Sequence, residues 1–219
     1  MNMERHRVRI RFRKQGDLRL IGHRDLARAW ERVFRRAGVD VRMSEGFHPK
    51  PRLSFPSALA MGVAGLDEVL DAELTEPHSP ETLLAALAPR LVEGLSIKSI
   101  EPLPAEGRAS RVERVAYELP IPDDRQAALA ERLAHWPEAA TAQRQRGSGQ
   151  RGVGHGGGKP VDLADLVERI ELCEGVLRLE VKVSGEGTAR PRELLAALGL
   201  DDLERQGAYF TRTAVKLNQ

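Results

Sequence analysis

Hydrophobic and polar positions alternate strictly near the start of the chain, over residues 7–13. Val8, Ile10 and Phe12 are each flanked on both sides by arginine. A period of two residues is typical of a β-strand with one face in the core and the other in water. The pattern therefore predicts a half-buried strand with a wholly cationic outer face. Because neighbouring like charges repel, this face needs either an anionic ligand or acidic residues from another strand, such as residues 68–73.

A helical pattern follows over residues 22–37, where apolar positions recur every three or four residues. The apolar side consists of Leu26, Ala29, Trp30, Val33, Phe34 and Ala37, and the opposite side of Arg24, Arg28, Arg32, Arg35 and Arg36. Gly22 can cap the start of this helix, and Gly38 can end it in a left-handed conformation. The pattern predicts an amphipathic helix with a cationic outer face, which is either simply solvated or a binding surface.

The next segments complete a pattern of alternating strands and helices in the first half. We expect a strand at 39–43, an extended loop at 44–56 that contains three prolines, a strand at 68–74, a helix at 80–92 and a strand at 95–100. Proline removes a backbone donor and holds the preceding residue away from the helical region, so the loop should remain irregular. The resulting order, β-α-β-β-α-β, is the ferredoxin-like pattern.

The second half repeats this order less regularly after a linker at 102–110. We expect strands at 112–121, near 141–145, at 176–183 and at 209–217, helices at 123–136 and 191–198, and a short element at 161–166. Seven of the twelve residues 147–158 are glycine, which indicates a flexible loop. The sequence therefore predicts an α+β protein of two tandem ferredoxin-like halves, at residues 1–101 and 111–219, the second irregular.

Charge is distributed unevenly along the chain. The 219 residues carry a formal net charge of only +2, yet residues 1–60 hold 15 Lys/Arg and 6 Asp/Glu, a local charge of +9. A hydrophobic content of 41 % and a charged content of 30 % suit a globular protein with a well-solvated surface. The local excess of positive charge points to an anionic partner for the first half.

Several classes of function are disfavoured by what the sequence lacks. There is no run of about 18 apolar residues and no apolar signal segment, so we expect a cytoplasmic protein with no membrane association. Cys173 is the only cysteine, which excludes an internal disulfide and an iron–sulfur cluster held by this chain alone. The histidines lack metal-ligand spacing, and no phosphate-binding glycine motif is present, so we expect no metal and no cofactor.

Candidate chemistry falls on two histidines. His23 stands at the first turn of the cationic helix, and His48 lies in the proline-rich loop, where the two could meet as acid and base. Alternatively, His23 organises the start of the helix and His48 packs the loop. Because no complete catalytic set is present, we expect no catalytic activity of the chain's own, with catalysis by His23 and His48 as the open alternative.

A nucleic-acid interface is the binding hypothesis that these positions suggest. Phe47, flanked by Gly46 and His48, is the loop aromatic best placed to stack on a base. The residues expected to contact phosphates are Arg9, Arg11, Arg28, Arg32 and Arg35, and those expected to contact nucleotides are Phe47, His48, Lys50 and Arg52. Phosphate contacts would make the affinity strongly dependent on salt.

Several motifs in the first half resemble one known family. They are Gly16-Asp-Leu-Arg-Leu-Ile-Gly-His-Arg-Asp-Leu, Arg35-Arg-Ala-Gly, Ser44-Glu-Gly-Phe-His-Pro-Lys-Pro-Arg-Leu-Ser-Phe and Gly62-Val. In this order they resemble the radical-SAM-linked protein family, a domain of unknown function found beside or fused to radical SAM proteins. Beyond residue 110 the likeness is looser, at 161–166, 187–191 and 212–213. At 164–165 the chain has Ala-Asp where the family would have Arg-Pro, which puts any role for that element in doubt.

The resemblance implies association with a radical SAM protein and supplies no reaction. The leading hypothesis is an accessory protein that binds tRNA or rRNA through its basic N-terminal surface and presents it to a radical SAM partner. A metal-independent RNA endonuclease of ferredoxin-like type is the enzymatic alternative, by analogy of fold alone. A protein-docking module, whose basic face meets an acidic patch on the partner enzyme, is the third hypothesis.

Overall fold

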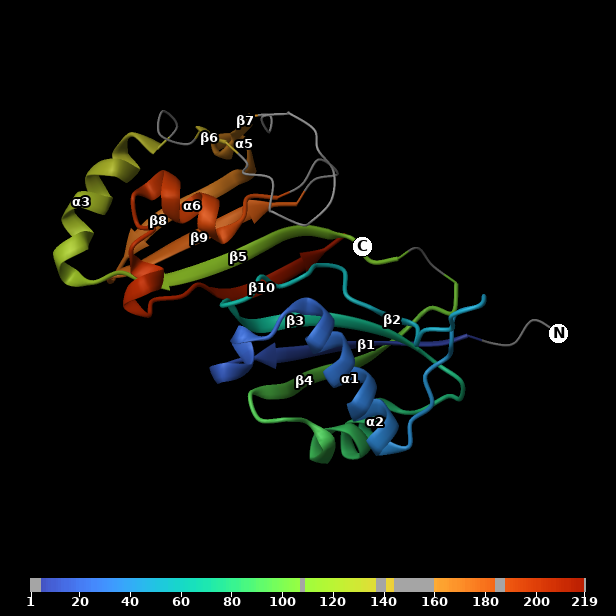
Figure 1. Ribbon diagram of the computed structural model, residues 1–219. Coiled ribbons are helices and arrows are strands. Elements are labelled where there is room, and N and C mark those ends of the chain that lie inside the picture. Colours follow the sequence, from blue (N-terminus) through green and yellow to red (C-terminus); the bar gives the residue numbers. More distant parts are fainter. Residues whose placement is uncertain (1–4, 107–108, 137–140, 144–159, 184–187, 219) are drawn as a thin grey trace. The chain divides into compact units, whose positions relative to one another are not determined.

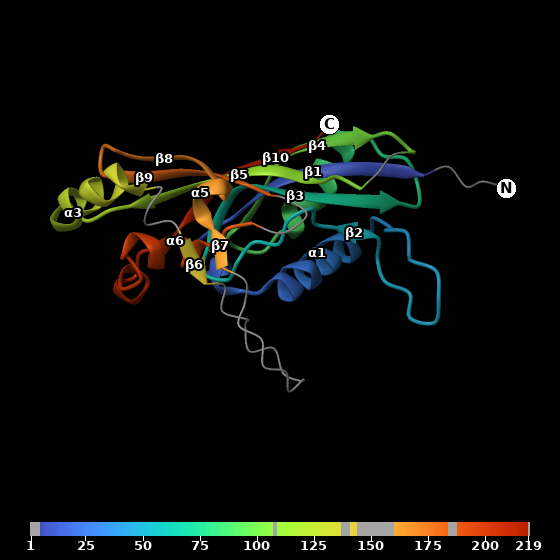
Figure 2. The same cartoon turned by 90° about the horizontal axis from the view of Figure 1, so that it is seen from above.

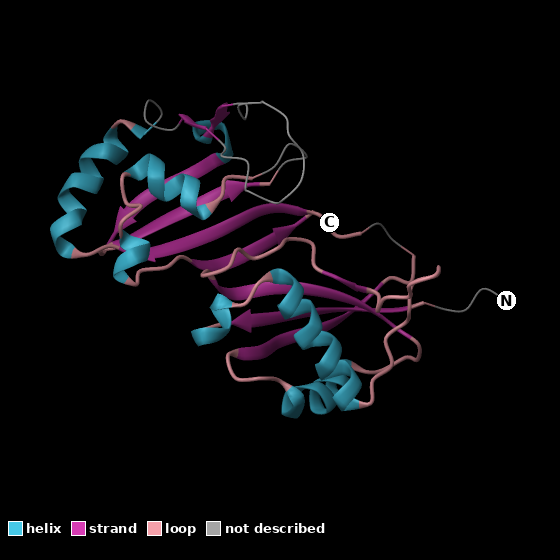
Figure 3. Ribbon diagram, viewed as in Figure 1, coloured by secondary structure: helices cyan, strands magenta, loops and turns pink. Residues whose placement is uncertain are grey.

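The computed structural model describes residues 5–106, 109–136, 141–143, 160–183 and 188–218. The chain divides into two compact units, of which the first comprises Met1–Glu113 with Thr211–Gln219 and the second comprises Arg114–Phe210. Each unit contains helices and strands, so the protein is of the α+β class, as predicted (Figure 3). The predicted flexible loop at 147–158 lies outside the described residues.

The first unit contains the elements that bear the predicted binding residues (Figure 1). In chain order they are β1 (His6–Lys14), the 3-10 helix η1 (Gly16–Leu20), α1 (His23–Ala37), β2 (Leu53–Ser54), β3 (Ala64–Leu74), α2 (Pro80–Leu87), η2 (Ala88–Arg90), β4 (Leu95–Leu103) and β10 (Thr211–Leu217). The alternating segment at 7–13 and the helix at 22–37 are thus confirmed almost to the residue. Both patterns extend over several repeats, which makes them strong local signals.

The strands of the first unit lie in the order β4-β1-β3-β10. β1 is antiparallel to both β3 and β4, whereas β10 is parallel to the start of β3, with Arg212 opposite Gly65. β2 pairs with the other end of β3, where Leu53 lies opposite Ala72. The same edge of β3 therefore pairs with β10 along its first residues and with β2 along its last residues. The finer description of the chain as two tandem ferredoxin-like halves stays a prediction.

One hydrophobic core lies between this sheet and its helices. Ile10 and Phe12 of β1 are fully buried, and the ring of Phe12 meets that of Trp30 of α1 edge to face at 5.1 Å. Leu83 and Leu87 of α2 belong to the same cluster. Figure 2 shows α1 on one side of the sheet that contains β1 and β3. The alternation of β1 therefore sends its apolar residues toward the helices and its arginines toward the opposite face.

The strand predicted at 39–43 is not a continuous strand. Val41 and Met43 form only isolated bridges, to Leu74 and Pro51 respectively. The short strand on this edge of β3 is instead β2, which lies within the segment predicted as a loop. Pro51, which lies opposite Met43, lacks the backbone donor that a longer ladder between these two segments would need.

The second unit is built on three antiparallel strands in the order β5-β9-β8. Its elements are β5 (Val112–Pro120), α3 (Asp123–Ala134), β6 (Thr141–Gln143), β7 (Pro160–Asp162), α5 (Leu163–Leu166), β8 (Val167–Cys173), β9 (Val176–Lys182), α6 (Pro191–Leu198) and η3 (Leu203–Gln206). β6 and β7 form a separate antiparallel pair. β8 was not predicted as a full strand, because apolar and polar residues do not alternate strictly along its sequence, Val-Glu-Arg-Ile-Glu-Leu-Cys.

The last strand forms part of the first unit. The sequence places 209–217 in the second half, and the strand itself is confirmed as β10, but it pairs with β3. Parallel pairing with a strand so distant in sequence leaves no local signal. The division of the chain into two domains at residues 1–101 and 111–219 stays a prediction. No helix in the described part of the chain is long and apolar enough to cross a membrane.

We expect Ile10→Ala to lower the free energy of unfolding of the first unit by about 2–5 kcal/mol, because it leaves a cavity in a core without solvent contact. Leu84→Ala on α2 is the matched control, since Leu84 is partly exposed and its truncation should cost less than about 1 kcal/mol. Denaturant unfolding of both variants measures the difference. Equal losses would contradict the assignment of Ile10 to the core.

Candidate nucleic-acid interface and a buried charge cluster

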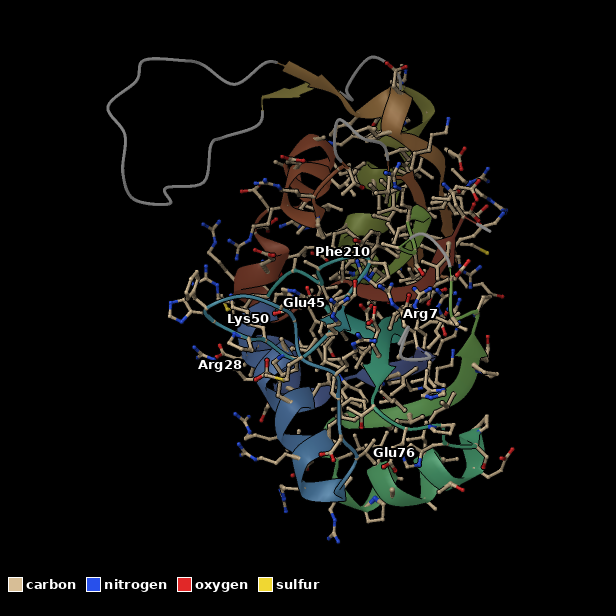
Figure 4. The ribbon with its side chains drawn as sticks, turned by 90° about the vertical axis from the view of Figure 1, so that its right-hand side faces the viewer. Arg7, Arg28, Glu45, Lys50, Glu76 and Phe210 are labelled. Carbon is tan, nitrogen blue, oxygen red and sulfur yellow. The ribbon has the colours of Figure 1, made fainter. Side chains whose placement is uncertain are left out.

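The predicted cationic residues lie on two opposite faces of the first unit's sheet. The buried side chains of β1 point toward α1, so Arg9 and Arg11 lie on the other face. Figure 4 shows the same division, with Arg7 of β1 on one side and Arg28 of α1 on the other. The structure therefore does not bring the strand arginines together with the helix arginines into one surface.

The strand arginines are neutralised by carboxylates of β3. Arg9 forms a bidentate ion pair with Asp71, in which Nε lies 2.8 Å from Oδ1 and Nη2 lies 3.0 Å from Oδ2. Arg11 is paired with Asp67, which also accepts from Lys98. These are the cross-strand acidic partners that the sequence offered as the alternative to an anionic ligand. With partners in place, Arg9 and Arg11 have little capacity left for phosphate.

The outer face of α1 has a different charge balance. Its five arginines are all exposed: Arg24, Arg28, Arg32, Arg35 and Arg36. Asp25 lies 3.6 Å from Arg28, but both side chains are more than half exposed, so this pair is weak. Glu31 is the only other acidic residue on the helix. Over a helix about 22 Å long, this face therefore carries an excess of three positive charges.

A hydrogen-bonded hairpin carries the predicted aromatic residue. We call residues 43–51 the Phe47 hairpin. Its ends meet in a bridge between Met43 and Pro51, and the amide of Ser44 donates to the carbonyl of Lys50 at 2.8 Å. The amide of Lys50 donates in turn to the Ser44 hydroxyl at 2.9 Å. Phe47, at the tip, is fully exposed at 102 % relative accessibility.

The stem of the hairpin is fastened to β3. The amide of Arg42 donates to the carbonyl of Glu73 at 2.8 Å, and the amide of Glu73 donates to the carbonyl of Arg52 at 3.1 Å. The Arg52 side chain also contacts the Glu73 carboxylate, at 3.3 Å. Arg52 is therefore partly committed to holding the stem. His48 and Lys50 remain exposed beside Phe47.

The two candidate catalytic histidines have separate surroundings. His23 is the first residue of α1, and its ring meets Phe55 edge to face at 5.2 Å. His48 lies in the exposed hairpin. Within the described residues, neither a hydrogen bond nor a ring contact joins His23 to His48. A catalytic role for either residue stays a prediction.

A cluster of three buried charges, at Lys14, Glu68 and Arg212, was missed by sequence reasoning. Their relative exposures are 0, 2 and 2 %. Nε of Arg212 donates to Oε1 of Glu68 at 2.8 Å, and Nη2 donates to the other carboxylate oxygen. Nη1 donates to the hydroxyl of Ser57 at 3.0 Å. The pair therefore joins β10, β3 and the segment that follows β2.

Lys14 fixes a neighbouring segment in a similar way. Its ammonium donates to the carbonyl of Ile21 at 2.9 Å and contacts that of Arg19 at 3.3 Å. Arg19 belongs to η1, and Ile21 directly follows η1. Burial lowers the pKa of Lys14 below its ordinary value of 10.5. The negative charge of Glu68 acts in the opposite direction, and the positive charge of Arg212 adds to the lowering of the pKa.

The backbone around this cluster is tightly fitted. A side-chain carbon at Gly65 would lie 2.6 Å from Cγ of Glu68, so only glycine leaves room for the carboxylate. The amide of Gly62 donates to the carbonyl of Arg19 at 2.9 Å, which ties the two supported segments to each other. The family-like motifs at 16–26 and at Gly62 thus meet around the buried charges.

One sequence signal could have revealed part of the cluster. Lys14 continues the even-numbered series of Val8, Ile10 and Phe12, so a lysine stands where the alternation demands a core residue. A charge at a core position needs a partner, although the sequence does not say which one. The groups that bond to Lys14 and Arg212 belong to the protein itself. The role of this cluster is therefore structural: it holds distant segments of the chain in place.

Taken together, fold and site define an α+β protein with one uncompensated cationic helix face and a hairpin that exposes an aromatic ring. Among the described residues, no group of three or more His, Cys, Asp or Glu is placed to hold a metal ion. Residues 7–191 match the family described as an uncharacterized protein conserved in bacteria (DUF2344). The chain belongs to this family. Its description names no radical SAM protein, so that association stays a proposal.

Comparison with other known proteins adds little about function. No curated protein matches the chain. One of the similar solved structures is the crystal structure of an unknown protein from Galdieria sulphuraria, which is 12 % identical. The match covers 99 % of this chain and 100 % of that one, with a TM-score of 0.27.

We expect Arg212→Met to lower the free energy of unfolding by about 3–5 kcal/mol, because it leaves Glu68 buried without its partner. Glu68→Leu should cost a similar amount, and the double variant should recover much of the loss. Denaturant unfolding of the four proteins gives the coupling. The exposed pair Arg192 and Glu204 is the matched control, with an expected coupling below about 1 kcal/mol. Additive losses of unfolding free energy in the double variant would contradict a coupled buried pair.

The lowered pKa of Lys14 predicts a dependence of stability on pH. Between the folded-state pKa and 10.5, the unfolded chain binds more protons than the folded one, so the contribution of Lys14 to stability rises with pH. The free energy of unfolding of the wild type, relative to Lys14→Met, should therefore rise toward pH 10. The exposed Lys216→Met on β10 is the control. Parallel pH profiles for wild type and Lys14→Met would refute the prediction.

Proposed function

We propose that this protein is an RNA-binding accessory protein whose interface is formed by the outer face of α1 and the Phe47 hairpin. The observation that carries the proposal is the row of five exposed arginines on α1, which outnumber the two carboxylates of the same helix by three. Regularly spaced arginines on one helix face suit the phosphates of a nucleic-acid backbone. We leave Arg9 and Arg11 out of the proposed interface, because both are already paired with aspartates.

The position of the hairpin supports the same interface. In Figures 2 and 4 the hairpin projects on the side of the sheet that α1 covers, and Lys50 extends on the same side as Arg28. An exposed aromatic ring beside positive charges combines the two kinds of contact that RNA offers, to bases and to phosphates. An acidic protein surface would match the charges but would leave the Phe47 ring without a comparable partner.

The proposed partner is a radical SAM protein, to which the chain presents tRNA or rRNA. This part of the proposal rests on the motif resemblance and on the cysteine count. A single cysteine cannot hold the cluster that radical SAM chemistry requires, so a separate protein would have to supply it. We also propose a ferredoxin-like fold for the first unit, supported by the antiparallel order β4-β1-β3-β2 around its core.

The test is RNA binding as a function of salt concentration. We expect Arg28→Gln, Arg32→Gln and Arg35→Gln combined to weaken binding and to reduce the slope of log affinity against log salt by about 2, for three lost contacts to a single strand. Fluorescence anisotropy with a labelled RNA measures both quantities. The control removes three exposed arginines elsewhere: Arg90, Arg111 and Arg205.

Two outcomes would count against this function. Equal losses in the two triple variants would mean that only net charge matters and that α1 forms no defined interface. Absence of RNA binding at low salt would end the proposal. A complex with a partner protein that survives nuclease and depends on the same arginines would then favour the protein-docking module. No contact in the described structure favours the endonuclease.

A further inference from the structure

The Phe47 hairpin is built to present its ring to solvent. A phenylalanine in full contact with water forgoes the stabilisation that burial of its ring would bring. Nevertheless the loop around it is held by the Met43–Pro51 bridge and by two hydrogen bonds between Ser44 and Lys50. Gly46 has φ of +115°, a conformation that other residues rarely adopt. The ring is thus displayed by a defined backbone.

The stem of the hairpin is anchored to the sheet. The stem is joined to β3 through Glu73, whose backbone and carboxylate contact Arg42 and Arg52. Pro49 and Pro51 fix two further backbone angles. A ligand that covers Phe47 therefore meets a loop whose two ends are already held together, which lowers the cost of ordering it on binding.

The neighbouring charges indicate the class of ligand. The hairpin itself carries Lys50 and Glu45, both exposed, and the cationic face of α1 lies on the same side of the sheet as Lys50. An exposed aromatic ring on the same side of the sheet as a cationic helix face matches a nucleobase attached to its phosphates. In an uninterrupted duplex, however, the bases are stacked on one another and their faces are closed to such a ring.

We propose that the Phe47 hairpin stacks on an unpaired nucleotide, so that the RNA recognised by this protein contains a single-stranded loop, bulge or end. This inference rests on the proposed function and names its substrate class. The arginines of α1 hold the backbone of the same RNA through its phosphates. Phe47 then supplies the preference for unpaired RNA, which charge alone does not give.

The experiment compares two labelled RNAs with equal numbers of phosphates, a stem–loop and a blunt, uninterrupted duplex. We expect Phe47→Ala to weaken binding of the stem–loop by about 5- to 150-fold, the range for loss of one base–aromatic stack, and to change duplex binding by less than about twofold. Phe47→Trp should retain the preference for the stem–loop. Met61→Ala removes another exposed apolar side chain and should change neither affinity.

A spectroscopic readout separates stacking from a structural role. With 2-aminopurine in the loop of the stem–loop, binding to the wild type should change the fluorescence in a way that Phe47→Ala abolishes at saturating protein. Equal effects of Phe47→Ala on both RNAs, or none on either, would overturn the inference. If the α1 triple variant still loses RNA binding in that case, the proposed function stands and only the stacking role fails. Loss of protein partners with unchanged RNA binding would also overturn the inference.

Discussion

The buried ion pair between Arg212 and Glu68 is the interaction on which the first unit depends. Removing two charges from water is costly, and the cost is recovered only where hydrogen bonds and geometry are nearly complete. Here the guanidinium reaches the carboxylate and Ser57 at once, and Lys14 lies in the same buried region. The last strand of the chain is therefore fixed against a strand that precedes it by 144 residues.

Charge in the first unit serves two distinct purposes. On the face of the sheet opposite α1, Arg9 and Arg11 are matched by Asp71 and Asp67. The arginines of α1 are left without comparable partners among the described residues and remain in solvent. Three of the nine excess positive charges in the first 60 residues thus lie on one helix face, where they are available to an external anion.

The proposed interface combines this helix face with a preformed aromatic hairpin. The two parts make different physical contributions, since charge gives affinity that falls with salt and a stacked ring gives a preference for unpaired bases. Both are held by the same sheet, one through the core beneath α1 and the other through Glu73. A defect in the core beneath α1 should therefore weaken the interface as well.

The sequence by itself determined β1, α1 and the α+β class. These features follow from local backbone geometry, because side chains alternate along a strand and recur every 3.6 residues along a helix. Only the tertiary structure decided which charges are paired, why 39–43 fails as a strand, and that β10 joins β3. The partners of Arg11 and Arg212 come from distant segments, and a pairing between distant segments leaves no periodic trace in the chain.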